Sequence, residues 1–153
     1  MKVIMLTDSL SCEGRCEKLC KIVNSFVKKG KYEFYAFCSE DDSIDGDIIS
    51  FIPVCDGDGI IDYVREIVGN ERFFLVLEKV ALPLDYGKML KSHLSEDWGI
   101  TVGAYGLKNG KWQNTGVFIV ESEYLDTVDT LHSFERNVVI PCAENGELNV
   151  FFA

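Results

Sequence analysis

Short, uninterrupted apolar runs are the feature that most constrains the fold of this chain. Residues 3–6, 73–77 and 117–120 contain no polar side chain. Strands with one face in water alternate apolar and polar residues, whereas strands buried on both faces are continuously apolar. These runs therefore predict strands at the centre of a sheet whose two faces are both covered.

Segments with helical periodicity separate these runs, and the helices that they predict would cover the two faces of the sheet. In residues 12–29, apolar side chains recur every three or four positions. They are Cys12, Cys16, Leu19, Cys20, Val23, Phe26 and Val27. Similar spacing predicts helices at 60–68, from Pro83 to residue 94, with Leu94 on the buried side, and at 124–134.

The remaining apolar segments complete the pattern. Further strands are expected at 32–38, 48–54 and 100–105, with a hairpin-like turn at 108–111. Two short segments close the chain, 138–140 and 148–152, with a turn between them. Because strands alternate with helices, we expect a single α/β domain over residues 1–153. Its sheet is Rossmann-like: mainly parallel, with helices on both faces and short antiparallel strands near the C-terminus.

The formal charge of −10 limits the partners of this chain. An acidic surface repels phosphate backbones and anionic lipids, so neither nucleic acid nor membrane is expected to bind. A small phosphorylated ligand is compatible with this net charge, because one basic group or a bound cation can override the average negative field at its binding site. A second copy or another protein also remains a candidate partner. Asp8 interrupts the first apolar stretch, so no secretory leader is expected and a cytoplasmic location follows.

Six cysteines suggest a thiol or metal function that their spacing does not support. In a cytoplasmic chain they should be reduced thiols, and no Cys-x2-Cys pair is present for zinc. Cys12, Cys16 and Cys20 continue an apolar helical stripe, so core packing is the favoured interpretation. His93 and His132 are expected to be partly exposed on amphipathic helices, without a catalytic role.

Several polar residues at expected strand ends have two interpretations each. Asp56 and Asp58 could bind a divalent cation, or Asp58 could cap the helix that follows. Arg15 could contact a phosphate or be a solvated helix residue. Glu78 and Lys79 follow a central strand, where ligands bind in open α/β sheets, but they could also form an ordinary ion pair.

Five segments, in order along the chain, resemble the core of the sugar-1-phosphate nucleotidyltransferases. The match begins with the strand at 71–77, which in that family leads to a metal-binding aspartate. It continues through the helix at 85–90 and the asparagine–small–glycine strand at 114–120, and it ends with segments 133–141 and 147–151. The resemblance implies the nucleotide-diphospho-sugar transferase fold.

The chain departs from this family at the positions that carry chemistry. Where the family has a glycine-rich phosphate loop, residues 8–14 retain only Gly14. At the first metal position the family has an aspartate, whereas this chain has Glu78 followed by Lys79. The segment between Tyr105 and Asn114 is shorter than the family's sugar-binding insert. The sequence ends at Ala153, before the region of the family's second metal carboxylate.

The resemblance and the expected strand ends together give a set of candidate site residues, and the catalytic groups stay unknown. The ligand-binding candidates are Gly14, Arg15, Asn114 and Gly116. The metal candidates are Asp56, Asp58 and Glu78, with magnesium as the implied cofactor. The favoured hypothesis is a divergent domain that binds a nucleotide or nucleotide sugar, with degraded catalytic residues and a regulatory or accessory role. The alternative is a minimal active sugar-1-phosphate nucleotidyltransferase that uses a magnesium–nucleoside triphosphate.

Overall fold

A computed structural model describes most of the chain: residues 1–6, 15–26, 31–39, 48–55, 59–77, 84–128, 130 and 134–153. The strands are β1 (Lys2–Leu6), β2 (Glu33–Ser39), β3 (Ile49–Val54), β4 (Phe73–Leu77), β5 (Ile100–Gly106), β6 (Trp112–Val120) and β7 (Leu148–Phe152). The helices are α1 (Arg15–Ser25), α2 (Ile60–Val68), α3 (Tyr86–His93), α4 (Ile140–Glu144), the 3-10 helix η2 (Ser122–Thr127) and the π-helix η4 (Glu135–Val139). None of these helices is long and apolar enough to cross a membrane.

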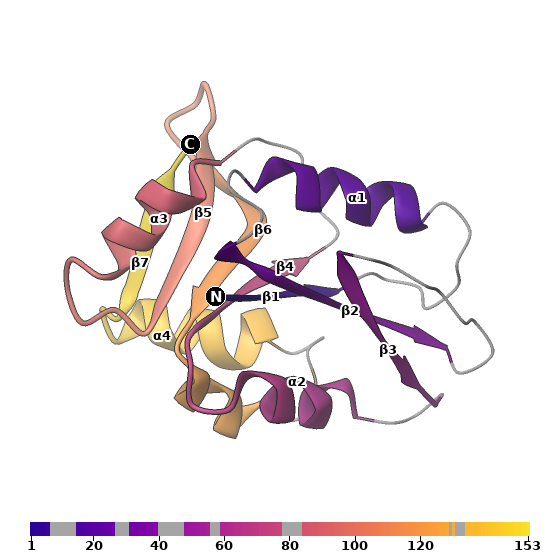
Figure 1. The fold of residues 1–153 in the computed structure, drawn as a ribbon. Coiled ribbons are helices and arrows are strands. Elements are labelled where there is room, and N and C mark those ends of the chain that lie inside the picture. The colour runs from indigo at the N-terminus through magenta and orange to yellow at the C-terminus, as the bar shows by residue number, and fades with distance from the viewer. Residues whose placement is uncertain are drawn as a thin grey trace.

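All seven strands belong to one sheet, in the order β3-β2-β1-β4-β6-β5-β7 (Figure 1). Only β6 runs antiparallel to its neighbours β4 and β5, and the other pairs are parallel. The short turn after β5 explains this direction, because two strands joined by a few residues can only pair antiparallel. The expected mainly parallel α/β sheet is confirmed, and its last strand, β7, lies parallel to β5.

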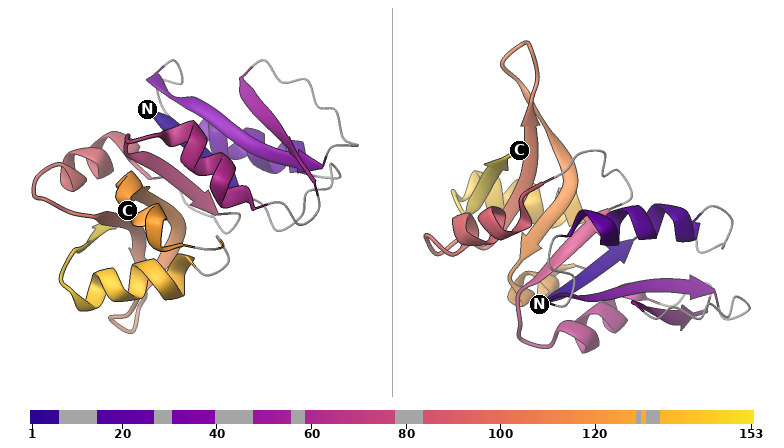
Figure 2. Two further views of the ribbon diagram at one scale, coloured as in Figure 1. Left: turned by 90° about the horizontal axis from the view of Figure 1, so that it is seen from below. Right: turned by 45° about the horizontal axis from the view of Figure 1, so that its top comes forward.

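Helices cover both faces of the sheet (Figure 2). On one face, α1 and α3 pack on a cluster that includes Phe26, Phe34 and Phe74. On the other face, α2, η2, η4 and α4 cover a second cluster that includes Phe118 and Phe134. The continuous apolar runs predicted this arrangement, because every side chain from Phe73 to Val76 and from Val117 to Val120 is buried.

The structure corrects the sequence predictions in two helices. Helix α1 ends at Ser25, and Cys20 is exposed instead of lying on its buried stripe. Helix α3 is capped by Asp85, whose carboxylate accepts a hydrogen bond from the Lys88 amide at 3.0 Å. Leu94 lies just after α3 and is exposed rather than buried. Pro83, the predicted start of this helix, lies outside the described residues.

The region after β6 also differs from the predicted pattern. Residues 122–127 form a 3-10 helix instead of the start of a long α-helix. The apolar segment 138–140 belongs to η4 and α4, which together run from Glu135 to Glu144. Pro141 lies at the start of α4, within this continuous helical stretch, and its missing amide proton leaves a carbonyl of the preceding turn without that donor. The buried side chains of Val138 and Cys142 then join the core on one face of the sheet.

Candidate ligand-binding site at the carboxyl edge of the sheet

The carboxyl edge of the parallel strands brings the described candidate residues to one place. β1 and β4 end there at the paired residues Leu6 and Leu77. Because β6 is antiparallel and Val117 pairs with Val76, the first half of β6 lies at the same edge. In open α/β sheets, ligands bind outside the carboxyl ends of the strands. Asn114 and Gly116, which sequence analysis singled out, therefore lie where a ligand is expected.

Local hydrogen bonds hold the Asn114 side chain in a defined orientation. The Gly116 amide donates to Asn114 Oδ1 at 2.9 Å, so the amide oxygen is occupied and the NH2 group faces outward from this turn. Gly116 adopts a φ of 81°, in the left-handed region that favours glycine. The asparagine–small–glycine pattern thus has a physical basis: the glycine permits the backbone turn that the asparagine side chain closes.

Thr115 anchors this turn to the neighbouring strand. Its hydroxyl donates to the Gly103 carbonyl at 2.8 Å and accepts from the Val117 amide at 3.3 Å. The β5–β6 register shifts between Val102 and Ala104, so a bulge lies next to the turn. Bulges of this kind commonly redirect a side chain beside a functional site. The buried Thr115 contacts therefore fix the position from which Asn114 projects.

Glu135 lies beside Asn114, and sequence reasoning did not single it out. Asn114 Nδ2 donates to Glu135 Oε1 at 3.4 Å, and both side chains are half-buried. Glu135 begins η4, twenty-one residues further along the chain. The only sequence signal was its place within segment 133–141 of the family resemblance, which assigned it no role. The pair presents an amide donor and a carboxylate acceptor side by side at the edge of the sheet.

The other predicted site residues have no described side chains. Gly14, Asp56, Asp58 and Glu78 lie outside the described residues. For Arg15 the structure gives the backbone, which begins α1. Within the part of the chain that is described, no group of three or more His, Cys, Asp or Glu side chains is placed to hold a metal ion. The magnesium site therefore stays a prediction.

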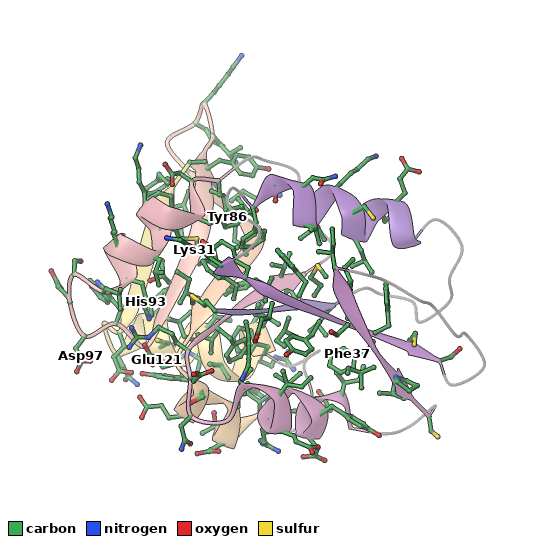
Figure 3. The ribbon with its side chains drawn as sticks, viewed as in Figure 1. Lys31, Phe37, Tyr86, His93, Asp97 and Glu121 are labelled. Carbon is green, nitrogen blue, oxygen red and sulfur yellow. The ribbon has the colours of Figure 1, made fainter. Side chains whose placement is uncertain are left out.

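A second polar cluster lies at the opposite, amino edge of the sheet, around His93 (Figure 3). His93 is 1% exposed, which corrects the expectation of a partly exposed side chain. Its Nδ1 lies 2.8 Å from Thr101 Oγ1, and its Nε2 lies 3.0 Å from Glu121 Oε1. The same carboxylate oxygen accepts from Arg72 Nε at 2.8 Å. His93 thus joins α3 to β5 and to the start of η2, while His132 lies outside the described residues.

A cavity of about 930 Å³ opens beside this cluster at the amino edge. Its lining includes Lys2 and Arg72, and each of these cations has a carboxylate partner. Lys2 pairs with Glu71 at 3.3 Å, and Arg72 pairs with Glu121. The cavity lies at the opposite end of the strands from Asn114. We therefore place the candidate ligand site by the carboxyl ends of the strands and not by this cavity.

The side chains of Cys142 and Tyr124 both have strongly raised pKa values. Burial raises the pKa of the Cys142 thiol to about 11, and the nearby Glu147 carboxylate adds to the shift. Burial and the hydrogen bond to Glu147 likewise raise the pKa of Tyr124. Nucleophilic cysteines need a lowered pKa. Cys142 therefore packs as an inert side chain in the core.

Comparison with known proteins identifies the fold. No protein-family model and no curated protein sequence matches this chain. Among solved structures, it resembles a protein from Bacillus anthracis described as a glucose-1-phosphate thymidylyltransferase, crystallised with sucrose. The TM-score is 0.63 at 11% identity, over 99% of this chain and 86% of the other.

A second solved structure gives the same result. HddC from Yersinia pseudotuberculosis matches with a TM-score of 0.63 at 14% identity, over 99% of this chain and 89% of that protein. At these identities the likeness concerns the fold alone. It agrees with the fold that the sequence resemblance implied. The chain has a nucleotide-sugar nucleotidyltransferase-like fold.

Proposed function

We propose that this protein is a divergent nucleotidyltransferase-like domain that binds a nucleotide or a nucleotide sugar and has a regulatory or accessory role. The observation that carries the proposal is the pairing of Asn114 with Glu135 beside Gly116, at the carboxyl edge of the sheet. Open α/β sheets bind their ligands at this edge, and the fold matches proteins named for nucleotide-sugar chemistry.

The Asn114–Glu135 pair suits the hydroxyl groups of a sugar. A hydroxyl both donates and accepts, so it can bond the Glu135 carboxylate and the Asn114 amide together. At 3.4 Å the direct bond between these side chains is at the long limit for an N–H···O contact. A ligand hydroxyl that replaces this bond therefore costs little hydrogen-bond energy, and it forms a new hydrogen bond to the charged Glu135 carboxylate.

The start of α1 suits the phosphates of such a ligand. α1 follows β1 in the chain and begins at Arg15. The first turn of a helix has free amide donors and a positive dipole end, both of which favour anions. In a chain with a net charge of −10, this local field and a guanidinium group would offset the general repulsion of phosphate. A bound magnesium ion would add further charge neutralisation, although the proposal does not depend on one.

The proposal of degraded catalysis rests on sequence. Residues 8–14 carry one glycine where close approach of backbone amides to a triphosphate needs several. Glu78 and Lys79 replace the aspartate that the resemblance leads us to expect. Transfer of a nucleotidyl group relies mainly on electrostatic stabilisation by metal and backbone donors. We therefore expect binding without appreciable turnover.

Ligand binding tests the proposal directly. Calorimetry and thermal unfolding are measured with Mg²⁺ and each nucleoside triphosphate, and with common nucleotide sugars. A ligand at one hundred times its Kd should stabilise the protein by about 2.7 kcal/mol. Asn114→Ala should weaken binding of the sugar-containing ligand, whereas Gln113→Ala, an exposed neighbour on β6, should not. The binding proposal fails if no ligand of either class stabilises the protein.

Pyrophosphate release separates the two functional hypotheses. With a sugar 1-phosphate and a magnesium–nucleoside triphosphate, we expect no release above background. Release that depends on both substrates would contradict the proposed loss of catalysis. It would instead support the alternative, a minimal active sugar-1-phosphate nucleotidyltransferase.

A further inference from the structure

Within the described part of the chain, no strand pairs with the outer edge of β7. β7 ends the strand order, and its inner edge pairs with β5. The Ala153 amide donates to the Ala104 carbonyl of β5 at 2.9 Å. Backbone groups alternate in direction along a strand, so Leu148, Val150 and Phe152 direct their N–H and C=O groups away from β5. Such a row binds another extended strand.

β7 lacks the features that usually protect a sheet edge. Natural edge strands carry charged residues, prolines or bulges that prevent pairing with another chain. The opposite edge strand, β3, contains Pro53, which cannot donate to a neighbour. The sequence of β7 is Leu-Asn-Val-Phe-Phe, with no charge and no proline. Phe152 is 52% exposed, and Ile140 on the preceding helix α4 is 53% exposed.

Opposite charges lie beyond the two ends of β7. Glu144 and Glu147, both exposed, come just before the strand. At the other end, Phe152 pairs with Ala104, and β5 continues past this point into the turn that carries the exposed Lys108 and Lys111. Figure 1 shows this turn beside the C-terminus and α4 at the opposite end of β7. If the β7 strands of two copies ran antiparallel, the acidic end of each strand would lie beside the basic end of the other.

We propose that β7 pairs antiparallel with β7 of a second copy around a two-fold axis. The register centred on Val150 pairs all five residues of each strand and matches their outward backbone groups. Two-fold symmetry places the same surface on both protomers, and an uncharged strand avoids like-charge contacts there. The seven-stranded sheets of the two protomers then form one continuous sheet. This inference is independent of any nucleotide binding.

Backbone substitution tests the pairing. Analytical ultracentrifugation over a range of concentrations should show a monomer–dimer equilibrium for the natural chain. Val150→Pro removes an outward N–H on both protomers, and proline is tolerated where the N–H of an edge strand faces solvent. Val150→Ala shortens the side chain further than proline does but keeps the N–H, so it controls for the loss of side-chain contacts. We expect Val150→Pro to weaken the dimer about tenfold or more relative to Val150→Ala. A natural chain that stays monomeric, or equal dimerisation of two folded variants, overturns the proposal.

A charge swap tests the antiparallel arrangement without changing β7. Lys108→Glu or Glu144→Lys alone should raise the dimer dissociation constant about fivefold, because each change affects two symmetric contacts. The double variant restores opposite charges across the interface, and its dissociation constant should return toward that of the natural chain. If the effects of the two single changes on the dimer dissociation constant simply combine in the double variant, the antiparallel arrangement is wrong.

Discussion

Glu121 accepts a hydrogen bond from the buried imidazole of His93, with 3.0 Å between Oε1 and Nε2. A carboxylate can only accept, so Nε2 carries a proton. On the other side of the ring, Thr101 Oγ1 accepts from Asn149 Nδ2 at 3.2 Å and can donate its own proton to Nδ1. The chain of hydrogen bonds is thus complete with the Nε2-protonated tautomer, and it connects α3, β5, β7 and the residue before η2.

Replacing His93 tests how much this cluster stabilises the fold. His93→Ala removes a partner from the fully buried Thr101 and leaves a cavity beside Glu121. We expect the free energy of unfolding to fall by about 2–4 kcal/mol, measured by urea denaturation. Leu94→Ala, an exposed change one residue away, should cost less than about 0.5 kcal/mol. Equal losses for the two variants would contradict a structural role for the buried imidazole.

The Arg65 side chain on α2 donates hydrogen bonds to backbone carbonyls in and just after η2, and we expect these bonds to stabilise the packing of the two helices. Its Nη2 donates to the carbonyls of Leu125 at 2.7 Å and Val128 at 3.0 Å. Arg65→Ala leaves both carbonyls without this donor, so the free energy of unfolding should fall by about 1–3 kcal/mol. Asp62→Ala removes the exposed ion pair to Arg65 and an acidic side chain from the first turn of α2, and it should cost about 0–1 kcal/mol. Denaturation curves in which Asp62→Ala is the more damaging change would disprove this assignment.

Gly103 should not tolerate a larger side chain. A Cβ there would lie 2.7 Å from Leu84 Cδ1 and 2.9 Å from Thr115 Oγ1. The leucine methyl can move, but the threonine hydroxyl is held by two hydrogen bonds. Gly103→Ala should therefore cost about 1–3 kcal/mol of stability and disturb the Asn114 turn. Gly106→Ala on the same strand has nothing within 4 Å of its Cβ and is the matched control. Comparable melting temperatures for both variants would refute the predicted crowding.

Cys142 should make stability depend on alkaline pH. Burial raises the pKa of its thiol from 9.0 to about 11, so the folded state holds this proton when the unfolded state has lost it. The stabilisation is fully present below pH 9 and decreases as the pH rises from 9.0 to about 11. Cys142→Ala should reduce this pH dependence in denaturation measured across the range. The same thiol should react slowly with a thiol reagent at pH 8, while the exposed Cys20 and Cys55 react readily.

Sequence analysis predicted the elements that depend on burial on both faces. The runs that became β1, β4 and part of β6 were recognisable because a central strand has no solvent-facing positions. It failed where local pattern and tertiary environment disagree. Cys20 fits an apolar stripe but lies on the exposed side of α1, and His93, which was expected to be partly exposed, is buried. Its imidazole is tolerated in the core because two partners from distant segments satisfy both ring nitrogens.

The residues of the candidate site also differ in whether the sequence alone could identify them. Asn114 and Gly116 were named from the family resemblance of segment 114–120. The structure then shows the local turn, in which the Asn114 side chain accepts from the amide of the left-handed Gly116. Glu135 was not singled out, because its contact with Asn114 depends on how η4 packs against the sheet. The antiparallel pairing of β5 with β6, in contrast, agrees with the hairpin-like turn predicted at 108–111, which is a local signal.

The sequence by itself determined the α/β class and the central strands, since these follow from hydrophobic periodicity. Only the tertiary structure decided that Glu135 lies beside Asn114, that His93 is buried, and that β7 forms an edge without charge or proline. These features depend on contacts between residues far apart in the chain. Local patterns do not encode such contacts, because a side chain's neighbours across a sheet are set by strand order and register.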